Sequence, residues 1–184
     1  MSNRILLSIF CCILAFTHIA LARLGETQDQ SEDRYGIAKS DPSTQSFPLI
    51  NGAQHRTYHY QGWRIRVAFV DGIAVREEYS KIPAANVSPM IKDFELSAIL
   101  QAEQNGGSWK VRKTETSLNP VTFPQKTFES AITGTVWIRT DGALAFCRPG
   151  MDIVVRLETP AAAQADAHWK QQQEQKQRAA VPQF

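Results

Sequence analysis

Two Asp-Gly pairs, Asp71-Gly72 and Asp141-Gly142, constrain the fold of this chain more than any other feature. Each pair lies inside a stretch in which apolar and polar residues alternate, residues 63–79 and 135–147. Asp-Gly readily forms the tight turn of a β-hairpin, and alternation with a period of two is typical of strands that bury one face. The sequence therefore predicts two antiparallel hairpins.

The apolar pattern indicates how the first hairpin closes. A two-residue turn would place Val67 opposite Arg76, which would spoil the apolar face of the first strand. A three-residue loop that begins at Val70 pairs Phe69 with Ile73 instead. It is also the loop in which glycine takes a left-handed position after a type I turn. We therefore expect the three-residue loop.

The second hairpin follows the same reasoning. A three-residue loop over residues 140–142 gives two apolar pairs, Ile138 with Leu144 and Val136 with Phe146. We therefore expect the face that carries Leu144 and Phe146 to be buried. Cys147 alternates with these residues, so we expect it on the opposite face as a small, half-buried thiol rather than a nucleophile.

Two further strands extend the sheet. In residues 151–158 the apolar residues Ile153, Val155 and Leu157 fall on one face, and residues 56–60, before Trp63, are also expected to form a strand. Together with the hairpins they predict an α+β fold with a curved antiparallel sheet of at least five strands.

An amphipathic helix is expected between the hairpins, in residues 92–109. Three apolar residues recur there at helical spacing: Leu96, Ile99 and Leu100. Asp93 is a suitable cap and Gly106-Gly107 a suitable left-handed stop. A start at Ser88, with Pro89 in the first helical position, is equally sound chemically, so the start stays open. The helix should lie across the apolar face of the sheet.

A second, shorter helix is expected near residue 30. Thr27 and Gln30 have the spacing of a capping box, and Gly36 follows Tyr35 where a left-handed stop is expected. A helix this short is marginal alone, so it must dock on the rest of the protein. It serves either as a lid over one end of the sheet or as a helix presented to a partner.

Residues 1–22 have the layout of a secretory signal. One cation, Arg4, precedes an apolar run, and Ala20-Leu21-Ala22 matches a small-residue cleavage site. We predict cleavage after Ala22 and export to the periplasm or the medium. The alternatives are a transmembrane anchor, for which the run is too short to span ~30 Å of hydrocarbon, and a lipoprotein, whose cysteine would follow the run, whereas Cys11-Cys12 lies inside it.

Cleavage leaves a nearly neutral chain. Arg4 is the only charged residue of the signal, so 20 Lys and Arg become 19, against 18 Asp and Glu. This balance gives no electrostatic footprint for nucleic acid, and no transmembrane anchor remains. Cys147 is then the lone cysteine, so no intrachain disulfide can form. Residues 23–158 are expected to form a single α+β domain, and the Ala- and Gln-rich residues 159–184 a tail that is disordered or partly helical.

The sequence offers no catalytic residue, metal site or cofactor motif. His55 and His59 form an H-x-x-x-H, but on a strand these residues lie ~13 Å apart, too far for one ion. Glu77 and Glu78 are adjacent on a strand and therefore point to opposite faces. Gly106-Gly107-Ser108 matches no phosphate loop.

Three arginines are the weak candidates for binding: Arg64, Arg66 and Arg76. They crowd the second face of the first hairpin. This face is either a site for an acidic ligand or an ordinary solvated polar face.

Four stretches, RLGET..Q...RYG, YQGWRIRVAFVDG, NGGSWK and WIRTDGALAF, give the chain a family resemblance. Over residues 23–158 it resembles a group of small exported bacterial proteins of unassigned function, most clearly at Leu24–Thr27 and Arg34–Gly36. Members of that group carry cysteine where this chain has Ser31, which leaves Cys147 without a mate here. The capped helix and meander are also similar to the two-layer domain of SmpA/OmlA-type outer-membrane assembly lipoproteins and of beta-lactamase inhibitory proteins.

Two classes of function remain. The first is a non-catalytic module of the cell envelope or secreted space that binds another envelope or secreted protein through the outer face or edge of its sheet. The alternative is an enzyme whose site lacks any sequence signature. We expect the binding module, because no motif for catalysis is present.

Overall fold

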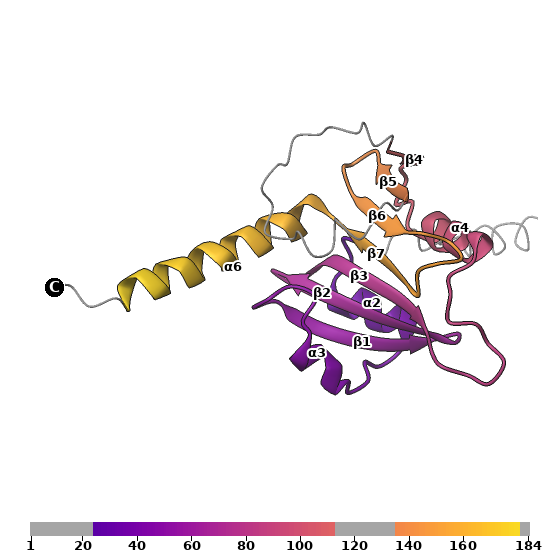
Figure 1. The fold of residues 1–184 in the computed structure, drawn as a ribbon, viewed down its shortest axis with the longest axis horizontal. Helices are drawn as coiled ribbons and strands as arrows, with labels where there is room; N and C mark the ends of the chain where they lie inside the picture. The colour runs from indigo at the N-terminus through magenta and orange to yellow at the C-terminus, as the bar shows by residue number, and fades with distance from the viewer. Residues whose placement is uncertain (1–23, 113–134, 181–184) are drawn as a thin grey trace, which may run out of the picture.

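The computed structural model describes residues 24–112 and 135–180, and these form an α+β fold around one open, seven-stranded antiparallel sheet (Figure 1). The expected signal, residues 1–22, lies outside the described residues. The strands are β1 (Gln54–Tyr60), β2 (Trp63–Val70), β3 (Ile73–Lys81), β4 (Trp109–Val111), β5 (Thr135–Arg139), β6 (Leu144–Cys147) and β7 (Val154–Glu158). The helices are α2 (Gln28–Tyr35), α3 (Pro42–Ser46), α4 (Asp93–Ala102) and α6 (Pro160–Ala179).

The strand order is β1-β2-β3-β7-β6-β5-β4. The two Asp-Gly hairpins, β2–β3 and β5–β6, therefore flank β7, which pairs with β3 on one side and β6 on the other. The predicted fold class, with at least five antiparallel strands and covering helices, is confirmed.

The first hairpin closes differently from the prediction. Val70 pairs with Ile73, so the turn has two residues, Asp71 and Gly72. Both have a left-handed backbone, with φ of 51° and 78°. This geometry belongs to a mirror-image hairpin turn, which Asp-Gly favours because aspartate tolerates the left-handed region. The predicted three-residue loop is wrong.

A β-bulge restores the face that the turn would otherwise invert. Phe69 pairs with Ala74, but Ala68 pairs with Arg76, so Val75 is an extra residue on β3. Beyond the bulge, Val67 lies opposite Glu77. The apolar face of β2 is thus kept, and an acidic side chain of β3 is brought into it.

The second hairpin has the predicted register and the opposite buried face. Ile138 pairs with Leu144, and Gly142 is left-handed with φ of 88°. However, Ala143, Ala145 and Cys147 are the buried residues, whereas Ile138 is 37 % exposed and Leu144 is half-buried. Two tryptophans of the neighbouring strands, Trp109 and Trp137, pack on the alanine side. Small residues leave room there for these rings, so side-chain volume rather than hydropathy determined which face of the hairpin is buried.

The main core lies between the sheet and the helices α2 and α4, on what we call the inner face. It contains buried side chains of β2, β3 and β7 together with Leu24, Tyr35, Leu96, Ile99 and Leu100. The predicted docking of both helices on the sheet is confirmed. The opposite side of the sheet is called the outer face.

Helix α4 begins at Asp93, so the alternative start at Ser88 is wrong. The N-cap is Lys92 rather than the predicted Asp93, and the Lys92 backbone N–H donates to Glu95 Oε2 at 2.7 Å. The helix ends at Ala102, before the predicted glycine stop. Gly107 instead approaches the second hairpin closely, because a Cβ there would lie 2.5 Å from Thr140 Oγ1.

Helix α2 has the predicted capping box between Thr27 and Gln30 and the predicted glycine, Gly36, with φ of 83° at its end. The residues before it are fastened to the tip of β3. Gly25 N–H donates to the Ala74 carbonyl at 2.8 Å, and Ala74 N–H donates to the Glu26 carbonyl at 2.8 Å. The first described residues are therefore part of the sheet assembly.

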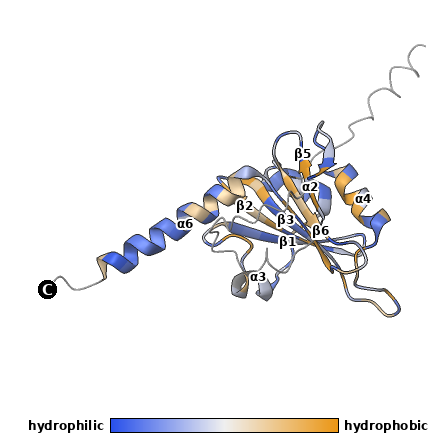
Figure 2. Ribbon diagram, turned by 45° about the horizontal axis from the view of Figure 1, so that its top comes forward, coloured by the Kyte–Doolittle hydropathy of each residue, from blue (hydrophilic) through white to orange (hydrophobic). Residues whose placement is uncertain are grey.

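Helix α6 starts on the outer face and then projects away from the sheet (Figure 1). Its buried Ala162 joins a small second core with Leu49, Ile50, Ala68 and Val75. Figure 2 shows that hydrophilic residues predominate along the projecting part of the helix. Of the residues that the sequence assigns to the tail, Pro160–Ala179 thus form one continuous helix whose first turns contact the sheet. Within the described ranges, no helix has the length and hydropathy needed to cross a membrane.

Candidate functional site

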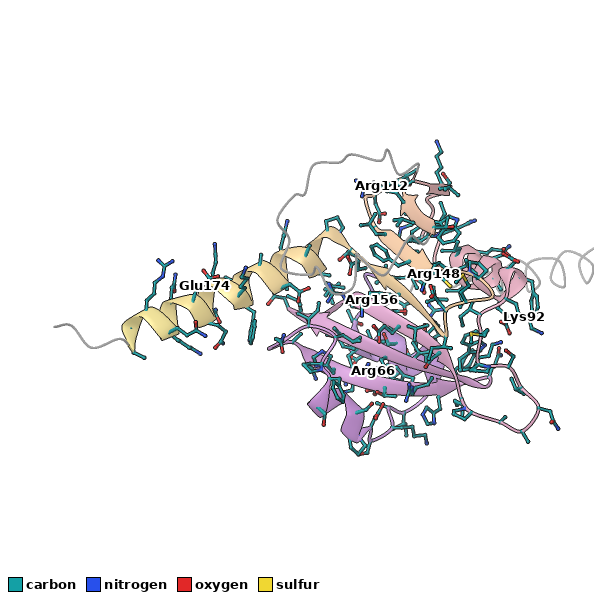
Figure 3. The ribbon with its side chains drawn as sticks, in the orientation of Figure 1. Arg66, Lys92, Arg112, Arg148, Arg156 and Glu174 are labelled. Atoms are coloured by element: carbon teal, nitrogen blue, oxygen red, sulfur yellow. The ribbon has the colours of Figure 1, made fainter. Side chains whose placement is uncertain are left out.

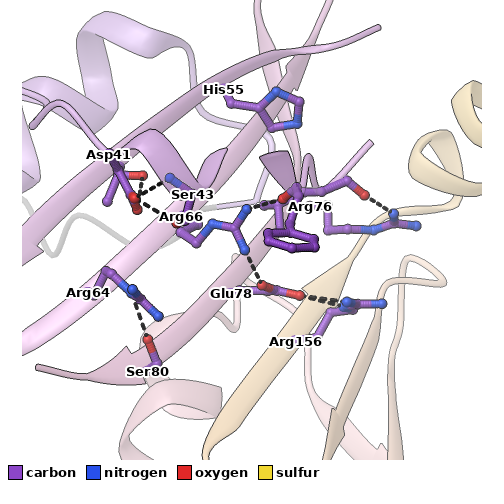
Figure 4. Close-up of polar contacts among 12 residues, drawn as sticks. Asp41, Ser43, His55, Arg64, Arg66, Arg76, Glu78, Ser80 and Arg156 are labelled. Atoms are coloured by element: carbon purple, nitrogen blue, oxygen red, sulfur yellow. Dashed lines mark hydrogen bonds and ion pairs between the residues drawn. The ribbon is translucent and has the colours of Figure 1, made fainter. Parts of the chain in front are cut away.

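The three candidate arginines share the outer face, as the sequence predicts. Register places Arg64 opposite Ser80, Arg66 opposite Glu78 and Ala68 opposite Arg76. Because partners in an antiparallel pair point to the same side, all three arginines project from one face (Figure 4). Their surroundings differ, however, and only two of them remain open to a ligand.

Arg76 is used within the fold. It is 3 % exposed, and its guanidinium contacts Glu158 at 2.9 Å and Asp166 at 2.8 Å. It also donates to the Leu49 carbonyl at 2.6 Å. These contacts tie β3 to β7, to α6 and to the segment before β1. Arg76 is therefore a structural residue that fastens α6 to the sheet.

Arg66 belongs to a bridged triad. Glu78 accepts from Arg66 Nη1 at 3.2 Å and from Arg156 Nη2 at 2.6 Å, and Arg66 also donates to the Phe47 carbonyl. The side chains of Arg66, Glu78 and Arg156 are 13 %, 12 % and 22 % exposed. Figure 3 shows Arg66 and Arg156 over the middle strands. One carboxylate thus serves two guanidinium groups that still reach the surface.

The sequence pattern did not single out Arg156. The alternation of β7 puts it on the outer face, because Val155 and Leu157 are buried on the inner face. Its position beside Glu78 depends on the pairing of β7 with β3, which are 78 residues apart at this contact. No local pattern indicates that pairing.

Arg64 lies at the end of this row. Its Nε donates to Ser80 Oγ at 3.2 Å, and it forms no ion pair with a described acid. Asp41 lies close enough for the charge of Arg64 to affect the pKa of its carboxyl group. Hydrogen bonds from Ser43 lower the pKa of Asp41, against the effect of burial, and the bond from Thr57 and the charge of Arg64 lower it further.

A groove opens beside this row, between the start of α3 and the edge strand β1. It is lined by Lys39, Ser40, Asp41, Pro42, His55, Arg56 and Thr57. Lys39 N–H donates to the Thr57 carbonyl at 2.7 Å, which holds the segment against β1. Asp41 caps α3 and accepts from Ser43 N–H at 2.9 Å. The groove is therefore a built part of the fold, and Lys39 and Arg56 give it a positive charge.

His55 and His59 lie on β1, as expected from the strand pattern. His55 Nε2 accepts from Ile50 N–H at 3.3 Å, which requires an unprotonated Nε2. Burial and the charge of Arg66 lower the pKa of His55. Among the described residues, no group of three or more His, Cys, Asp or Glu side chains is arranged to hold a metal ion.

The inner face contains a buried polar cluster that was not expected from the sequence. Tyr79 Oη lies 3.0 Å from Tyr35 Oη and 2.7 Å from Glu103 Oε1, and it also donates to Glu77. Leu24 N–H donates to Glu103 Oε2 at 3.1 Å. Glu77 and Glu103 are both 0 % exposed. The cluster joins α2, α4 and β3, and burial keeps its carboxylates from any external substrate in this conformation.

Cys147 is fully buried rather than half-buried, with 1 % exposure. Burial raises its pKa to about 12. Because only the thiolate is a strong nucleophile, the residue is unreactive near neutral pH. It packs as a small apolar group of β6.

Apolar side chains continue the outer face beyond the triad. Phe146 of β6 lies opposite Arg156 of β7, and Val136 of β5 lies opposite Phe146. These two residues are half-buried, and Ile138 is exposed. The outer face therefore carries a charged region over β2, β3 and β7 and an apolar region over β6 and β5.

Comparisons with known proteins add no relative to this description. The chain gives no significant match to a protein-family model, to a curated protein or to a solved structure.

Proposed function

We propose that this protein is an exported, non-catalytic module that binds another protein of the cell envelope or secreted space through the outer face of its sheet. The observation that supports this most directly is the contrast between the two faces. Helices α2 and α4 cover the inner face, whereas the outer face leaves a charged region beside apolar side chains. Such an adjoining pair of polar and apolar regions is typical of protein-binding surfaces.

The alternative, an enzyme, has less support. The acidic side chains best placed for catalysis, Glu77 and Glu103, are buried in a cluster that joins structural elements. Cys147 has a pKa that keeps it protonated. The outer face presents arginine and apolar groups, which are suited to binding.

Photo-crosslinking from the two sides of the protein tests this proposal. A photoreactive amino acid replaces Ile138 on the outer face in one variant and Ser97, an exposed residue of α4, in the other. After irradiation of producing cells, we expect a specific adduct with an envelope or secreted protein from position 138 and none from position 97. The same adduct from both positions, or adducts only from position 97, would contradict the assignment of the outer face.

Export is tested on the same cells. The protein should be recovered outside the cytoplasm with Arg23 as its first residue. Recovery of the exported protein with Met1 intact would contradict cleavage after Ala22.

A further inference from the structure

We propose that the groove and the outer-face arginines form one cationic surface that binds an acidic segment of the partner protein. The surface is defined by four cations, Lys39, Arg64, Arg66 and Arg156, and two acids, Asp41 and Glu78. Arg56 also lines the groove, but its register opposite Val67 places it on the inner-face side of β1, so it is not part of this surface. This inference rests on the proposed function, because it names the chemistry of the segment that the outer face would bind.

Two cations of this surface lack an acidic partner. Among the described residues, Lys39 and Arg64 form no ion pair. Arg64 donates to Ser80 Oγ at 3.2 Å, and the Lys39 side chain is exposed. Elsewhere on the same face, Arg66 and Arg76 do have carboxylate partners. The sheet therefore pairs its arginines where they are covered and leaves cations available beside the groove.

The acids of the surface are already engaged. Asp41 accepts from Ser43 and Thr57, and Glu78 lies between two guanidinium groups. The local excess of cations contrasts with a formal net charge of only +2 for the whole chain. A partner that brings carboxylates would balance this excess without displacing an existing ion pair.

Strand geometry sets the size of the segment. The surface runs from the edge strand β1 across β2 and β3 to β7. Three strand spacings of ~4.8 Å make roughly 14 Å, which an extended chain covers with about four to five residues. Phe146 lies directly beyond Arg156 on the same face. A segment that crosses the surface therefore places its acidic residues over the arginines and its next residues over an apolar side chain.

This order favours a polypeptide over a polyanion. Nucleic acid and other polyphosphates would gain from the charges alone, and their binding normally needs a strongly basic footprint. Here the cations are few, and apolar groups adjoin them. An acidic stretch followed by aromatic or aliphatic residues complements both regions.

Fluorescence anisotropy with a defined probe tests the inference. The probe is a fluorescein-labelled peptide of sequence Glu-Gly-Glu-Gly-Glu-Gly-Phe-Gly-Phe, titrated with the purified protein at low ionic strength. The test variant is Lys39→Gln/Arg64→Gln. Since an exposed ion pair changes an equilibrium by up to about fivefold, we expect the two substitutions together to weaken binding ~10-fold.

The matched control removes two cations from the projecting helix, Lys176→Gln/Arg178→Gln, and should bind within about twofold of the unaltered protein. A second variant, Lys39→Arg/Arg64→Lys, retains the charges and should keep most of the affinity. Thermal unfolding of every variant verifies that the fold is intact. Equal binding by the test variant and the control would overturn the proposal.

Two further measurements distinguish an acidic peptide from an anionic lipid as the ligand. The same peptide with glutamine in place of glutamate should bind at least ~10-fold more weakly, and vesicles of phosphatidylglycerol should not compete with the acidic peptide. Competition by the vesicles, or equal binding of the glutamine peptide, would overturn the assignment to an acidic polypeptide. If the acidic peptide does not bind while the crosslink from position 138 persists, the preference for an acidic segment is wrong and the proposed function is unaffected.

Discussion

The same kinds of side chain have different surroundings on the two faces of the sheet. Glu77 and Glu78 are neighbours on β3, yet Glu77 is buried in a cluster of tyrosines and Glu78 lies between two arginines near the surface. Inner-face polar groups join elements that are far apart in the chain, such as α2 and the end of α4. On the outer face, Arg76 is also buried and structural, but Arg64, Arg66 and Arg156 still reach the surface. The difference indicates that inner-face charges stabilise the fold, whereas the outer face also carries charges that are available for recognition.

Removal of the Tyr79 hydroxyl should have the largest effect. In Tyr79→Phe, the buried groups of Tyr35, Glu77 and Glu103 lose a shared partner. Because buried polar groups without partners are costly, we expect a loss of ~2–4 kcal/mol in the free energy of unfolding. Denaturant titration followed by circular dichroism measures it. A loss below ~1 kcal/mol would mean that the cluster contributes little to the fold.

Truncation after Glu158 tests the outer side of the sheet. It removes Ala162 from the second core and Asp166 from Arg76. We expect a loss of ~1–3 kcal/mol, since a buried cation loses one of its partners and apolar surface is exposed. A chain that ends at Lys170 keeps both contacts and should retain its melting temperature. Equal stability of the two truncated chains would show that the first turns of α6 contribute nothing.

Arg64→Gln should hardly change stability, within ~0.5 kcal/mol, because it breaks only one hydrogen bond near the surface. Arg76→Gln is the matched substitution on the same face, and there the buried contacts to Glu158 and Asp166 are broken. It should cost ~2 kcal/mol or more. Denaturation curves of the two variants that coincide would remove the distinction between structural and available arginines.

The smallest expected effect is on pH dependence. The pKa of His55 is lowered from its ordinary value of 6.5, first by burial and then by Arg66. The neutral form is therefore favoured in the folded state, and the contribution of His55 is complete above pH ~6.5 and is lost as the pH falls below it. Melting temperatures measured between pH ~5 and ~7 should rise less steeply with pH in His55→Gln. An unchanged slope would show that His55 protonates freely in the fold.

Local signals were sufficient for part of this fold. The capping box at Thr27 and the register around Gly142 depend on residues close in sequence, and both are confirmed. The first hairpin was mispredicted because Asp71 adopts a left-handed backbone and Val75 forms a bulge. Either feature alone would have shifted the β2–β3 register by one residue and inverted the buried face of the hairpin. Together they shift the register by two residues, so the buried face is kept.

Features that depend on distant contacts could not be predicted. The buried face of β6 was decided by the rings of Trp109 and Trp137, which lie on neighbouring strands. The shared face of Arg64 and Arg66 followed from their spacing, whereas the place of Arg156 beside Glu78 needed the β3–β7 pairing. The groove involves an irregular segment before β1, for which no periodicity exists.

The division between a stabilising inner face and a binding outer face is tested most directly by the affinity of folded variants for the acidic peptide. Tyr79→Phe and Lys39→Gln/Arg64→Gln are compared at a temperature at which thermal unfolding shows both to be folded. We predict that Tyr79→Phe binds within about twofold of the unaltered protein, while the double variant binds ~10-fold more weakly. Weakened binding by Tyr79→Phe together with unchanged binding by the double variant would contradict this account.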